Sequence, residues 1–315
     1  MNEIAKKIVG KLIELHGSKE FKIAFLPYKR SMWNSMESVY DECRNAGIDA
    51  HVYPIPYYRL KADGTVQSID TDYDYYEYAE PIETLEKPDY IVIHYYYDDL
   101  NRVTSMLPEY HTKAIKERYG CKIVFLPYGI KFDYSKPDSF YPSFYDVDYI
   151  FTNEITDEWM EAWKKVGVDW TGRIFNYGST KLDIARRIAG RKEVPSEWGI
   201  GDKKVTLITT SLIPYIEEPY KRILDYLVNT LVEISKGRAV IFRPHPLLRT
   251  TIKTMSPESE PYYDFLMDEL RAIRGVIVDE SEYLERAMLA ADYLISDPSS
   301  VVRMWQETDK PFRVM

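Results

Sequence analysis

Short apolar runs alternate with segments of helical period along almost the whole chain. This alternation is typical of parallel strands that are joined by helical crossovers, so the pattern predicts an α/β protein. In the first half of the chain it predicts strands over Phe21–Leu26, Ala50–Tyr53, Tyr90–His94, Ile123–Leu126 and Tyr149–Thr152, and helices over Ser35–Asn45 and Asp157–Lys165.

A charged stretch with several Gly and Pro residues interrupts this pattern between Gly190 and Lys204. Stretches of this kind often separate domains, so we expect one Rossmann-like domain over residues 1–190 and another over 191–315. Two such domains in tandem favour a ligand cleft between them, near the carboxyl ends of the strands. The second series predicts strands over Val205–Thr209, Ala239–Phe242, Val276–Val278 and Tyr293–Ile295, and helices over Tyr220–Ser235, Tyr262–Arg274 and Glu282–Ala291.

One segment, between Pro54 and Pro88, is rich in Tyr, Asp and Pro and has no clear helical period. It predicts a long loop, and loops of this length in compact domains are usually functional or mobile. The tyrosines of this segment, which includes the stretch from Asp70 to Tyr78, could stack on a ring or line an acceptor groove, but packing tyrosines in a folded-back loop are the favoured interpretation.

The composition agrees with an ordinary globular protein. The chain has 315 residues, enough for two domains, with 45% hydrophobic and 29% charged residues. A net charge of −9 argues against nucleic acid as the main partner, because proteins that track phosphates generally need a basic surface. Cys43 and Cys121 lack metal-ligand spacing and fit a reducing compartment.

The chain contains no apolar run of membrane-spanning length and no signal-peptide pattern, so we expect a cytoplasmic protein. Near the N-terminus, Ile4, Ile8, Leu12 and Leu15 repeat at helical spacing beside several lysines, including Lys11. An interfacial helix would give peripheral contact with the inner face of the membrane. A helix that packs on the core is the favoured alternative.

The first candidate functional motif is Arg243-Pro244-His245-Pro246, which directly follows a predicted strand. The two prolines stiffen the exit from the strand. Arg243 offers a fork of donors for phosphate oxygens, and His245 can transfer a proton near neutral pH. A rigid corner with a solvated histidine is the alternative.

The second constellation, Ser296-Asp297-Pro298-Ser299-Ser300, ends a predicted strand and opens a helix. Free N–H groups and hydroxyls at such a helix start favour an anion, although a plain serine N-cap is common. Ser296, Asp297, Ser299 and Ser300 are therefore our candidates for binding phosphate. A weaker signal of the same kind is the loop Gly178–Asp183.

Together these motifs resemble the CDP-glycerol glycerophosphotransferase family, which makes teichoic-acid-like polymers. The Arg-Pro-His-Pro strand exit and the Ser-Asp-x-Ser-Ser helix start occur in the same order, Lys310-Pro311 is similar to the family's Lys-Pro, and Gly178–Asp183 resembles its Gly-x-Pro-Arg-x-Asp segment. The N-terminal run from Phe25 to Tyr58, with Phe25-Leu26-Pro27-Tyr28-Lys29 and Pro54-Ile55-Pro56-Tyr57-Tyr58, is also similar to a subgroup of the family.

This resemblance implies a GT-B fold, with the CDP donor held by the C-terminal domain and the acceptor approached by the N-terminal one. The implied reaction moves glycerol-phosphate, or a related polyol-phosphate, from a CDP-linked donor to a hydroxyl of a cell-wall, capsule or lipid-linked acceptor and releases CMP. Positioning and charge neutralisation by Arg243, His245 and the Ser299/Ser300 helix start would drive it.

The chain departs from the family in two places. Where the family has a His-Gly pair, with the His as candidate base, this chain has Tyr128-Gly129, and a tyrosine with a pKa of roughly 10 is a poor base at neutral pH. Gly129 joins the candidate phosphate residues, and His94 is an alternative base, although a buried core histidine is the favoured interpretation. The chain also stops at Met315, at the start of an expected further strand, so we expect a shortened C-terminal domain.

Two other functions stay open at this stage: a GT-B glycosyltransferase that uses a nucleotide sugar, and a nucleotide-binding protein without catalytic activity. No group of side chains has a spacing that requires a metal, and no cofactor is required. Mg²⁺ could still enter with the donor phosphates. Asp297 is the nearest metal-ligand candidate, and its interpretation as a turn residue is preferred.

Overall fold

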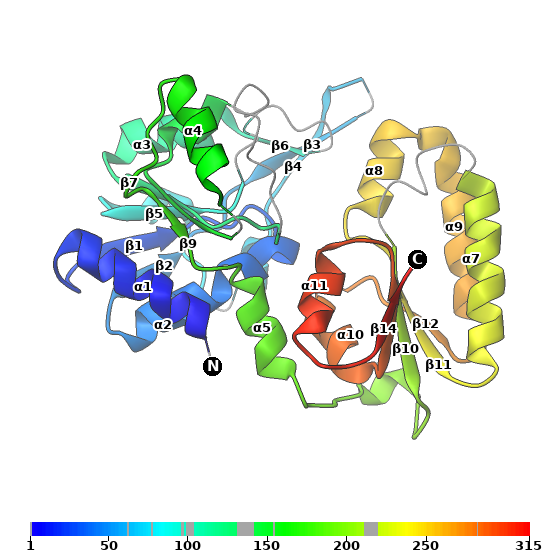
Figure 1. Cartoon of the computed structure of the whole chain (residues 1–315). Helices are drawn as coiled ribbons and strands as arrows, with labels where there is room; N and C mark the ends of the chain where they lie inside the picture. The colour runs from blue at the N-terminus through cyan, green and yellow to red at the C-terminus, as the bar shows by residue number, and fades with distance from the viewer. Residues whose placement is uncertain are drawn as a thin grey trace. The chain divides into compact units, whose positions relative to one another are not determined.

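The structure is a computed structural model, shown in Figure 1, and it describes residues 2–61, 63–76, 78–95, 98, 104–130, 142–153, 155–210, 220–281 and 283–315. The chain divides into two compact units. Unit 1 holds Met1–Leu60 and Val66–Arg187, and unit 2 holds Lys61–Thr65 and Ile188–Met315. The division falls close to the expected boundary at residues 190 and 191, whereas the acceptor and donor roles of the two domains remain predictions.

Unit 1 is built on a six-stranded parallel sheet in the order β2-β1-β5-β7-β8-β9. In Figure 1, α1 and α2 lie on one side of this sheet and α3 and α4 on the other. The strands of this sheet are β1 (Lys22–Phe25), β2 (Asp49–Val52), β5 (Tyr90–Ile93), β7 (Lys122–Phe125), β8 (Tyr149–Thr152) and β9 (Ile174–Asn176). Unit 1 also contains a three-stranded sheet of β3 (Tyr57–Leu60), β4 (Val66–Asp70) and β6 (Thr104–Met106). The helices of unit 1 are α1 (Glu3–His16), α2 (Glu37–Asn45), α3 (Thr112–Tyr119), α4 (Asp157–Lys165) and α5 (Lys181–Ile188), with 3₁₀ turns at Arg30–Ser35, Tyr73–Tyr75, Ile82–Thr84, Pro108–Tyr110 and Pro142–Asp146.

Unit 2 is built on a five-stranded parallel sheet in the order β12-β11-β10-β13-β14. Figure 1 shows α7 and α9 on one face of this sheet and α10 and α11 on the other. The strands are β10 (Val205–Thr209), β11 (Ala239–Arg243), β12 (Val276–Val278), β13 (Tyr293–Ser296) and β14 (Phe312–Val314). The helices are α7 (Tyr220–Ser235), α8 (Leu248–Met255), α9 (Glu260–Ala272), α10 (Leu284–Ala290) and α11 (Ser300–Gln306), with 3₁₀ turns at Ser196–Trp198 and Pro257–Ser259.

The local sequence explains why these elements form. Every residue of β10 and β11 is buried, which is what a strand covered by helices on both faces requires. At the start of α4, the Thr156 hydroxyl accepts a hydrogen bond from the Trp159 N–H (3.2 Å). This cap satisfies one of the donors that a helix start leaves open. Trp159 and Trp163, one helical turn apart, then bury the inner face of α4 against the core of unit 1.

The predicted strands and helices named above are confirmed, with ends that differ by two residues or fewer. The prediction of a loop over Pro54–Pro88 is wrong in part. Strands β3 and β4 form an antiparallel hairpin there, and β6 pairs on the other side of β3. Tyr57 lies in the core of unit 1, as the packing interpretation of these tyrosines expects.

The N-terminal segment is confirmed as a core-packing helix, because Ile4, Ile8 and Leu12 are buried in unit 1. Residue 282, where the last predicted helix begins, lies outside the described residues. The strand expected near the end of the chain is present as β14, which pairs with β13.

Candidate functional site

The carboxyl edge of the unit 2 sheet gathers both motif loops. The chain passes from β10 to β11 on one side and later returns to β13 on the other, so the strand order reverses beside β10. Thr209, the last residue of β10, is in register with Arg243 of β11 and with Ser296 of β13. Open α/β sheets bind ligands in the crevice outside the strand ends at such a reversal point. The two motifs singled out by sequence therefore flank the expected ligand position of this unit.

Arg243 is buried, and three hydrogen bonds hold its guanidinium. Nη1 lies 2.6 Å from the Asp279 carboxylate and 3.3 Å from the Ser281 hydroxyl, and Nη2 donates to the Ser281 carbonyl oxygen (2.6 Å). Asp279 is also buried, at 4% exposure. The guanidinium of Arg243 thus holds the loop after β12 in place. Direct contact between Arg243 and a phosphate stays a prediction.

His245 stands two residues beyond the end of β11 and is half-buried. Its Nδ1 accepts a hydrogen bond from the Leu247 N–H (3.2 Å), and its carbonyl oxygen accepts one from the Leu248 N–H (2.8 Å). Since Nδ1 acts as the acceptor, the neutral ring carries its proton on Nε2. The loop therefore fixes one tautomer, which presents Nε2 as a donor.

The Ser296 side chain belongs to the sheet edge itself. It is fully buried, accepts a hydrogen bond from the Thr209 hydroxyl (2.8 Å) and donates to the Asp297 carbonyl oxygen (2.8 Å). Ser299 is the extended N-cap residue of α11, its Oγ 3.3 Å from the Ser296 Oγ, and Ser300 is the exposed first residue of that helix. Ser296 thus shapes the loop. The phosphate-binding roles of these residues and of Asp297 remain predictions.

Lys310, in the Lys-Pro pair of the resemblance, has a structural role. Its ammonium donates to the carbonyl oxygens of Met288 (2.9 Å) and Ala291 (2.8 Å), at the end of α10. Carbonyl groups at the end of a helix lack partners within the helix, so this lysine satisfies two of them. Burial lowers the pKa of Lys310 from its ordinary value, which the charge of Asp292 partly offsets.

His94 is a buried core histidine, as the sequence interpretation favoured. The structure argues against its alternative role as a general base. Its ring is fully buried, Nε2 accepts the Tyr28 N–H (2.9 Å), and Nδ1 lies 3.3 Å from both the Met32 carbonyl oxygen and the Ser35 hydroxyl. Burial lowers its pKa to about 3, against an opposing hydrogen bond to Met32. A general base must reach the proton that it removes, and the Nε2 lone pair of His94 is used within the fold.

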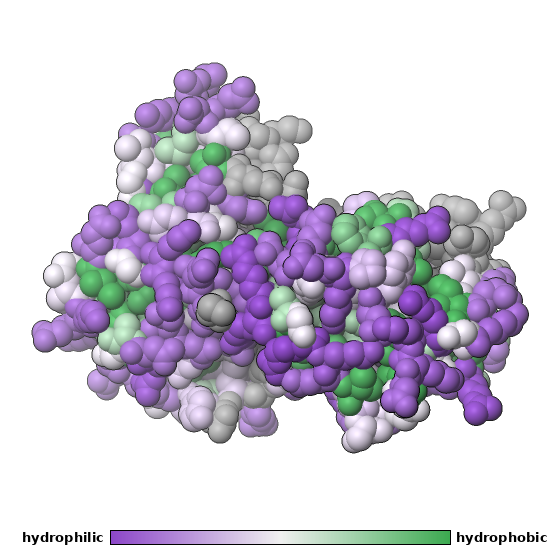
Figure 2. All heavy atoms as spheres, turned by 60° about the horizontal axis from the view of Figure 1, so that its bottom comes forward, coloured by the Kyte–Doolittle hydropathy of each residue, from purple (hydrophilic) through white to green (hydrophobic). Residues whose placement is uncertain are grey.

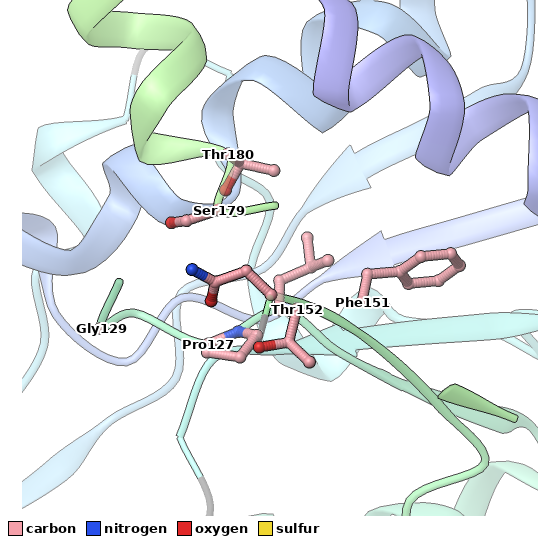
Figure 3. A pocket seen from close by; sticks show the side chains of 8 residues that line it. Pro127, Gly129, Phe151, Thr152, Ser179 and Thr180 are labelled. Carbon is pink, nitrogen blue, oxygen red and sulfur yellow. The ribbon is translucent and has the colours of Figure 1, made fainter. Parts of the chain in front are cut away.

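In unit 1, Gly129 lines a pocket at the carboxyl ends of β7 and β8, shown in Figure 3. Tyr128 is half-buried and packs against the core of the unit. The pocket is small and partly open to solvent. Its lining residues are Leu126, Pro127, Gly129, Phe151, Thr152, Asn153, Ser179 and Thr180. The structure thus brings Gly129 together with the Gly178–Asp183 segment. The catalytic role of Tyr128 and the phosphate role of Gly129 stay predictions.

Sequence reasoning missed Asp279 and Ser281, which hold Arg243 in place. A signal for them existed, because Asp279 directly follows the predicted strand Val276–Val278. Since the carboxyl ends of parallel strands meet at one edge of a sheet, a carboxylate there can be expected to face the Arg243 exit. In the described part of the chain, no group of three or more His, Cys, Asp or Glu side chains could hold a metal ion.

Among the described helices, none has both the length and the apolar composition that a membrane span needs. The face of the molecule in Figure 2 is mostly hydrophilic, with small separate apolar patches. Ile4, Ile8 and Leu12 of α1 are buried, whereas Leu15 is partly exposed. Cytoplasmic localisation and contact with a membrane remain predictions.

No protein-family model and no curated protein sequence matches the chain. Several solved structures match the chain. MnaA from S. aureus, solved with UDP, matches with a TM-score of 0.56 at 13% identity, over 93% of this chain and 79% of that one. The fold is GT-B-like.

Two further structures show the same likeness. The UDP-GlcNAc 2-epimerase of Neisseria meningitidis, bound to UDP-GlcNAc, has a TM-score of 0.55 at 13% identity, over 93% of this chain and 82% of that one. The UDP-GlcNAc 2-epimerase of Methanocaldococcus jannaschii, in complex with UDP-GlcNAc and UDP, has a TM-score of 0.55 at 12% identity, over 92% and 83%. At these identities the likeness establishes the fold alone. Structures of the wall teichoic acid polymerase TagF match at TM-scores of 0.45 and 0.49, which are too low to support an argument.

Proposed function

We propose that this protein transfers glycerol-phosphate, or a related polyol-phosphate, from a CDP-linked donor to a hydroxyl group of an acceptor and releases CMP. One observation carries the proposal: the Arg-Pro-His-Pro loop and the Ser-Asp-Pro-Ser-Ser loop leave the two strands that flank β10, at the point where the strand order reverses. In a sheet of this kind that point is the expected position of a nucleotide. The resemblance of the two motifs to the glycerophosphotransferase family supports a cytidine donor.

In the proposed reaction, the acceptor oxygen attacks the phosphorus that carries the polyol. The new O–P bond forms as the bond from this phosphorus to the bridging oxygen breaks, and CMP leaves with that oxygen. The acceptor hydroxyl loses its proton, and a proton donor near the leaving phosphate can neutralise developing charge. Because phosphoryl transfer requires little covalent catalysis by the protein, positioning of the reactants and electrostatic stabilisation account for most of the rate enhancement.

His245 is the residue to which we assign contact with the donor phosphates. Its Nδ1 accepts the Leu247 N–H, so the neutral ring offers the Nε2 proton. That proton can stabilise a phosphate oxygen or pass to the leaving CMP. Arg243 positions the neighbouring loop through Asp279 and Ser281. Ser299 and Ser300, at the start of α11, are assigned to the same phosphates.

The acceptor is proposed to be a polymer or a lipid-linked molecule, with the protein acting at the cytoplasmic side of the membrane. No cofactor other than the donor is part of the proposal. Mg²⁺, if required, would enter with the donor phosphates rather than bind to a preformed protein site.

CMP release from CDP-glycerol in the presence of glycerol-based acceptors tests the proposal, with the His245→Asn variant as the main comparison. Asn keeps a polar side chain but cannot transfer the proton, so release should fall at least about a hundredfold, in the range typical of a lost proton donor. The matched control is Arg249→Ala, which removes an exposed side chain of α8 in the same unit. Equal rates in the wild type and in His245→Asn would refute the assigned role.

The two alternatives give different results in the same assay. A nucleotide-sugar glycosyltransferase would turn over UDP- or GDP-sugars and leave CDP-glycerol intact. A protein without catalytic activity would bind cytidine compounds and release no CMP with any acceptor.

A further inference from the structure

Thr209 ends the central strand of the unit 2 sheet and stands between the two motif loops. It is in register with Arg243 of β11 on one side and with Ser296 of β13 on the other. Register partners in a sheet carry their side chains on the same face. Arg243, Thr209 and Ser296 therefore form a row along the carboxyl edge, and all three are buried, Thr209 at 5% exposure.

The hydrogen bonds of this row join Thr209 to the β13 side of the sheet. The Arg243 guanidinium is engaged by Asp279 and Ser281. The Thr209 hydroxyl donates to the Ser296 Oγ (2.8 Å). A hydroxyl has one proton to donate, so the proton of Thr209 is used on Ser296. Thr209 thus connects the central strand to the loop over residues 297–299, which leads from β13 to α11.

The Ser296 hydroxyl is saturated within the fold. Its single proton is donated to the Asp297 carbonyl oxygen (2.8 Å), and its Oγ lies near the hydroxyls of Thr209 (2.8 Å) and Ser299 (3.3 Å). A serine hydroxyl offers one donor and two acceptor lone pairs, and these three contacts occupy all of them. Because Ser296 donates to Asp297, Ser299 is the donor of the longer contact. Ser296 therefore acts on the loop and has no donor left for a phosphate.

Ser299 is held more loosely than Ser296. It is the half-buried N-cap residue of α11, yet its side chain makes no capping hydrogen bond with that helix. Its Oγ instead lies 3.3 Å from the Ser296 Oγ, which is longer than the roughly 2.7–2.8 Å of most O–H···O bonds. A contact of this length is weak, so the Ser299 hydroxyl can turn from Ser296 to a phosphate oxygen at little cost.

From these contacts we infer that Thr209 is a positioning residue for the donor phosphates, because through Ser296 it fixes the loop that carries Ser299. The inference rests on the proposed function, which assigns Ser299 to those phosphates. A loop that is already held in its binding geometry loses less conformational freedom when the donor binds. Thr209 should therefore raise the affinity for the phosphate part of the nucleotide and leave the affinity for the nucleoside part unchanged.

Isothermal titration of the full-length protein with CMP and with cytidine tests the inference. Thr209→Val keeps the β-branched shape and removes the hydroxyl, so the affinity for CMP should fall about threefold to tenfold, as expected from the net contribution of one hydrogen bond. Cytidine lacks the phosphate, so its affinity should equal that of the wild type. Thr209→Ser keeps the hydroxyl and should restore the affinity for CMP.

The matched control is Thr206→Val. Thr206 is another buried threonine of β10, at 1% exposure, and its hydroxyl accepts a hydrogen bond from Arg238 (3.3 Å). It stands near the start of the strand, away from the carboxyl edge. Thermal unfolding without ligand measures the loss of stability in both variants, whereas only Thr209→Val should lose affinity for CMP.

Equal affinity for CMP in Thr209→Val and in the wild type would overturn the positioning role and leave the proposed nucleotide site intact. An equal loss of affinity for CMP and cytidine would overturn it too, because the substitution would then disturb the whole site. Absence of binding of both compounds to the wild type would contradict the proposed function, and the inference with it.

Discussion

Arg243 and Asp279 form a buried ion pair, with 2.6 Å between Nη1 and Oδ2 and side-chain exposures of 4% and 3%. The pair joins the ends of two neighbouring strands, β11 and β12, beside the proposed nucleotide position. The arginine that the sequence marks as a phosphate ligand is thus part of the framework that holds the His245 loop.

Removing one partner of this pair should lower the stability of the folded protein. We expect Asp279→Ala to lower the free energy of unfolding by about 3–5 kcal/mol, because it leaves a buried guanidinium charge without its counter-ion. Urea unfolding of the purified variant measures this. The control is Asp264→Ala, which breaks the exposed Arg249–Asp264 pair and should cost less than about 1 kcal/mol. Similar losses in the two variants would contradict the structural role of the buried pair.

The Asp183 carboxylate should stabilise the start of α1. Asp183→Ala removes the acceptor of two N–H groups, those of Ile4 and Ala5, and we expect a loss of about 2 kcal/mol in the free energy of unfolding. Asp183→Asn keeps one acceptor oxygen and should lose less.

Chemical denaturation of the Asp183 variants compares these losses. Asp157→Ala, at an exposed position in the first turn of α4, is a control that should change stability little. Equal stability of the Asp183→Ala variant and the wild type would show that α1 does not depend on this cap.

His94 predicts a pH dependence of stability. Its pKa is about 3 in the folded protein, below its ordinary value of 6.5, because burial disfavours the charged ring. Between these values the unfolded chain binds one more proton than the folded chain at this site. The stabilisation is therefore fully present above pH 6.5 and is lost as the pH falls towards 3, by up to about 1.4 kcal/mol per pH unit.

The His94→Asn variant lacks this titration, so its free energy of unfolding should vary less with pH over that range. Urea unfolding at several pH values between 4 and 7 compares the two slopes. Identical slopes would mean that His94 does not titrate differently in the folded and unfolded chains.

The hydrophobic pattern was sufficient to predict most of both parallel sheets, because buried strands such as Val205–Thr209 are short apolar runs that few other structures permit. It did not predict the β3–β4 hairpin. That hairpin is half-exposed, and its signal is the Asp63-Gly64 turn between Tyr57–Leu60 and Val66–Asp70 rather than a continuous apolar run.

The candidate site could be predicted only as far as strand ends could be located. Arg243, His245 and Ser296 follow predicted strands, so their position at the sheet edge was foreseeable. The partners of Arg243 and the pocket beside Ser179 depend on side-chain contacts between segments far apart in the chain, which no local pattern specifies.

The most direct test of the proposed nucleotide site is the thermal unfolding midpoint of the protein with CDP-glycerol, CDP-ribitol, CMP, UDP-GlcNAc and GDP-mannose, each with and without Mg²⁺. A ligand that binds the native state raises the midpoint. We predict a rise that is confined to the cytidine compounds. A rise with UDP-GlcNAc or GDP-mannose alone, or no rise with any compound, would contradict a cytidine donor site in unit 2.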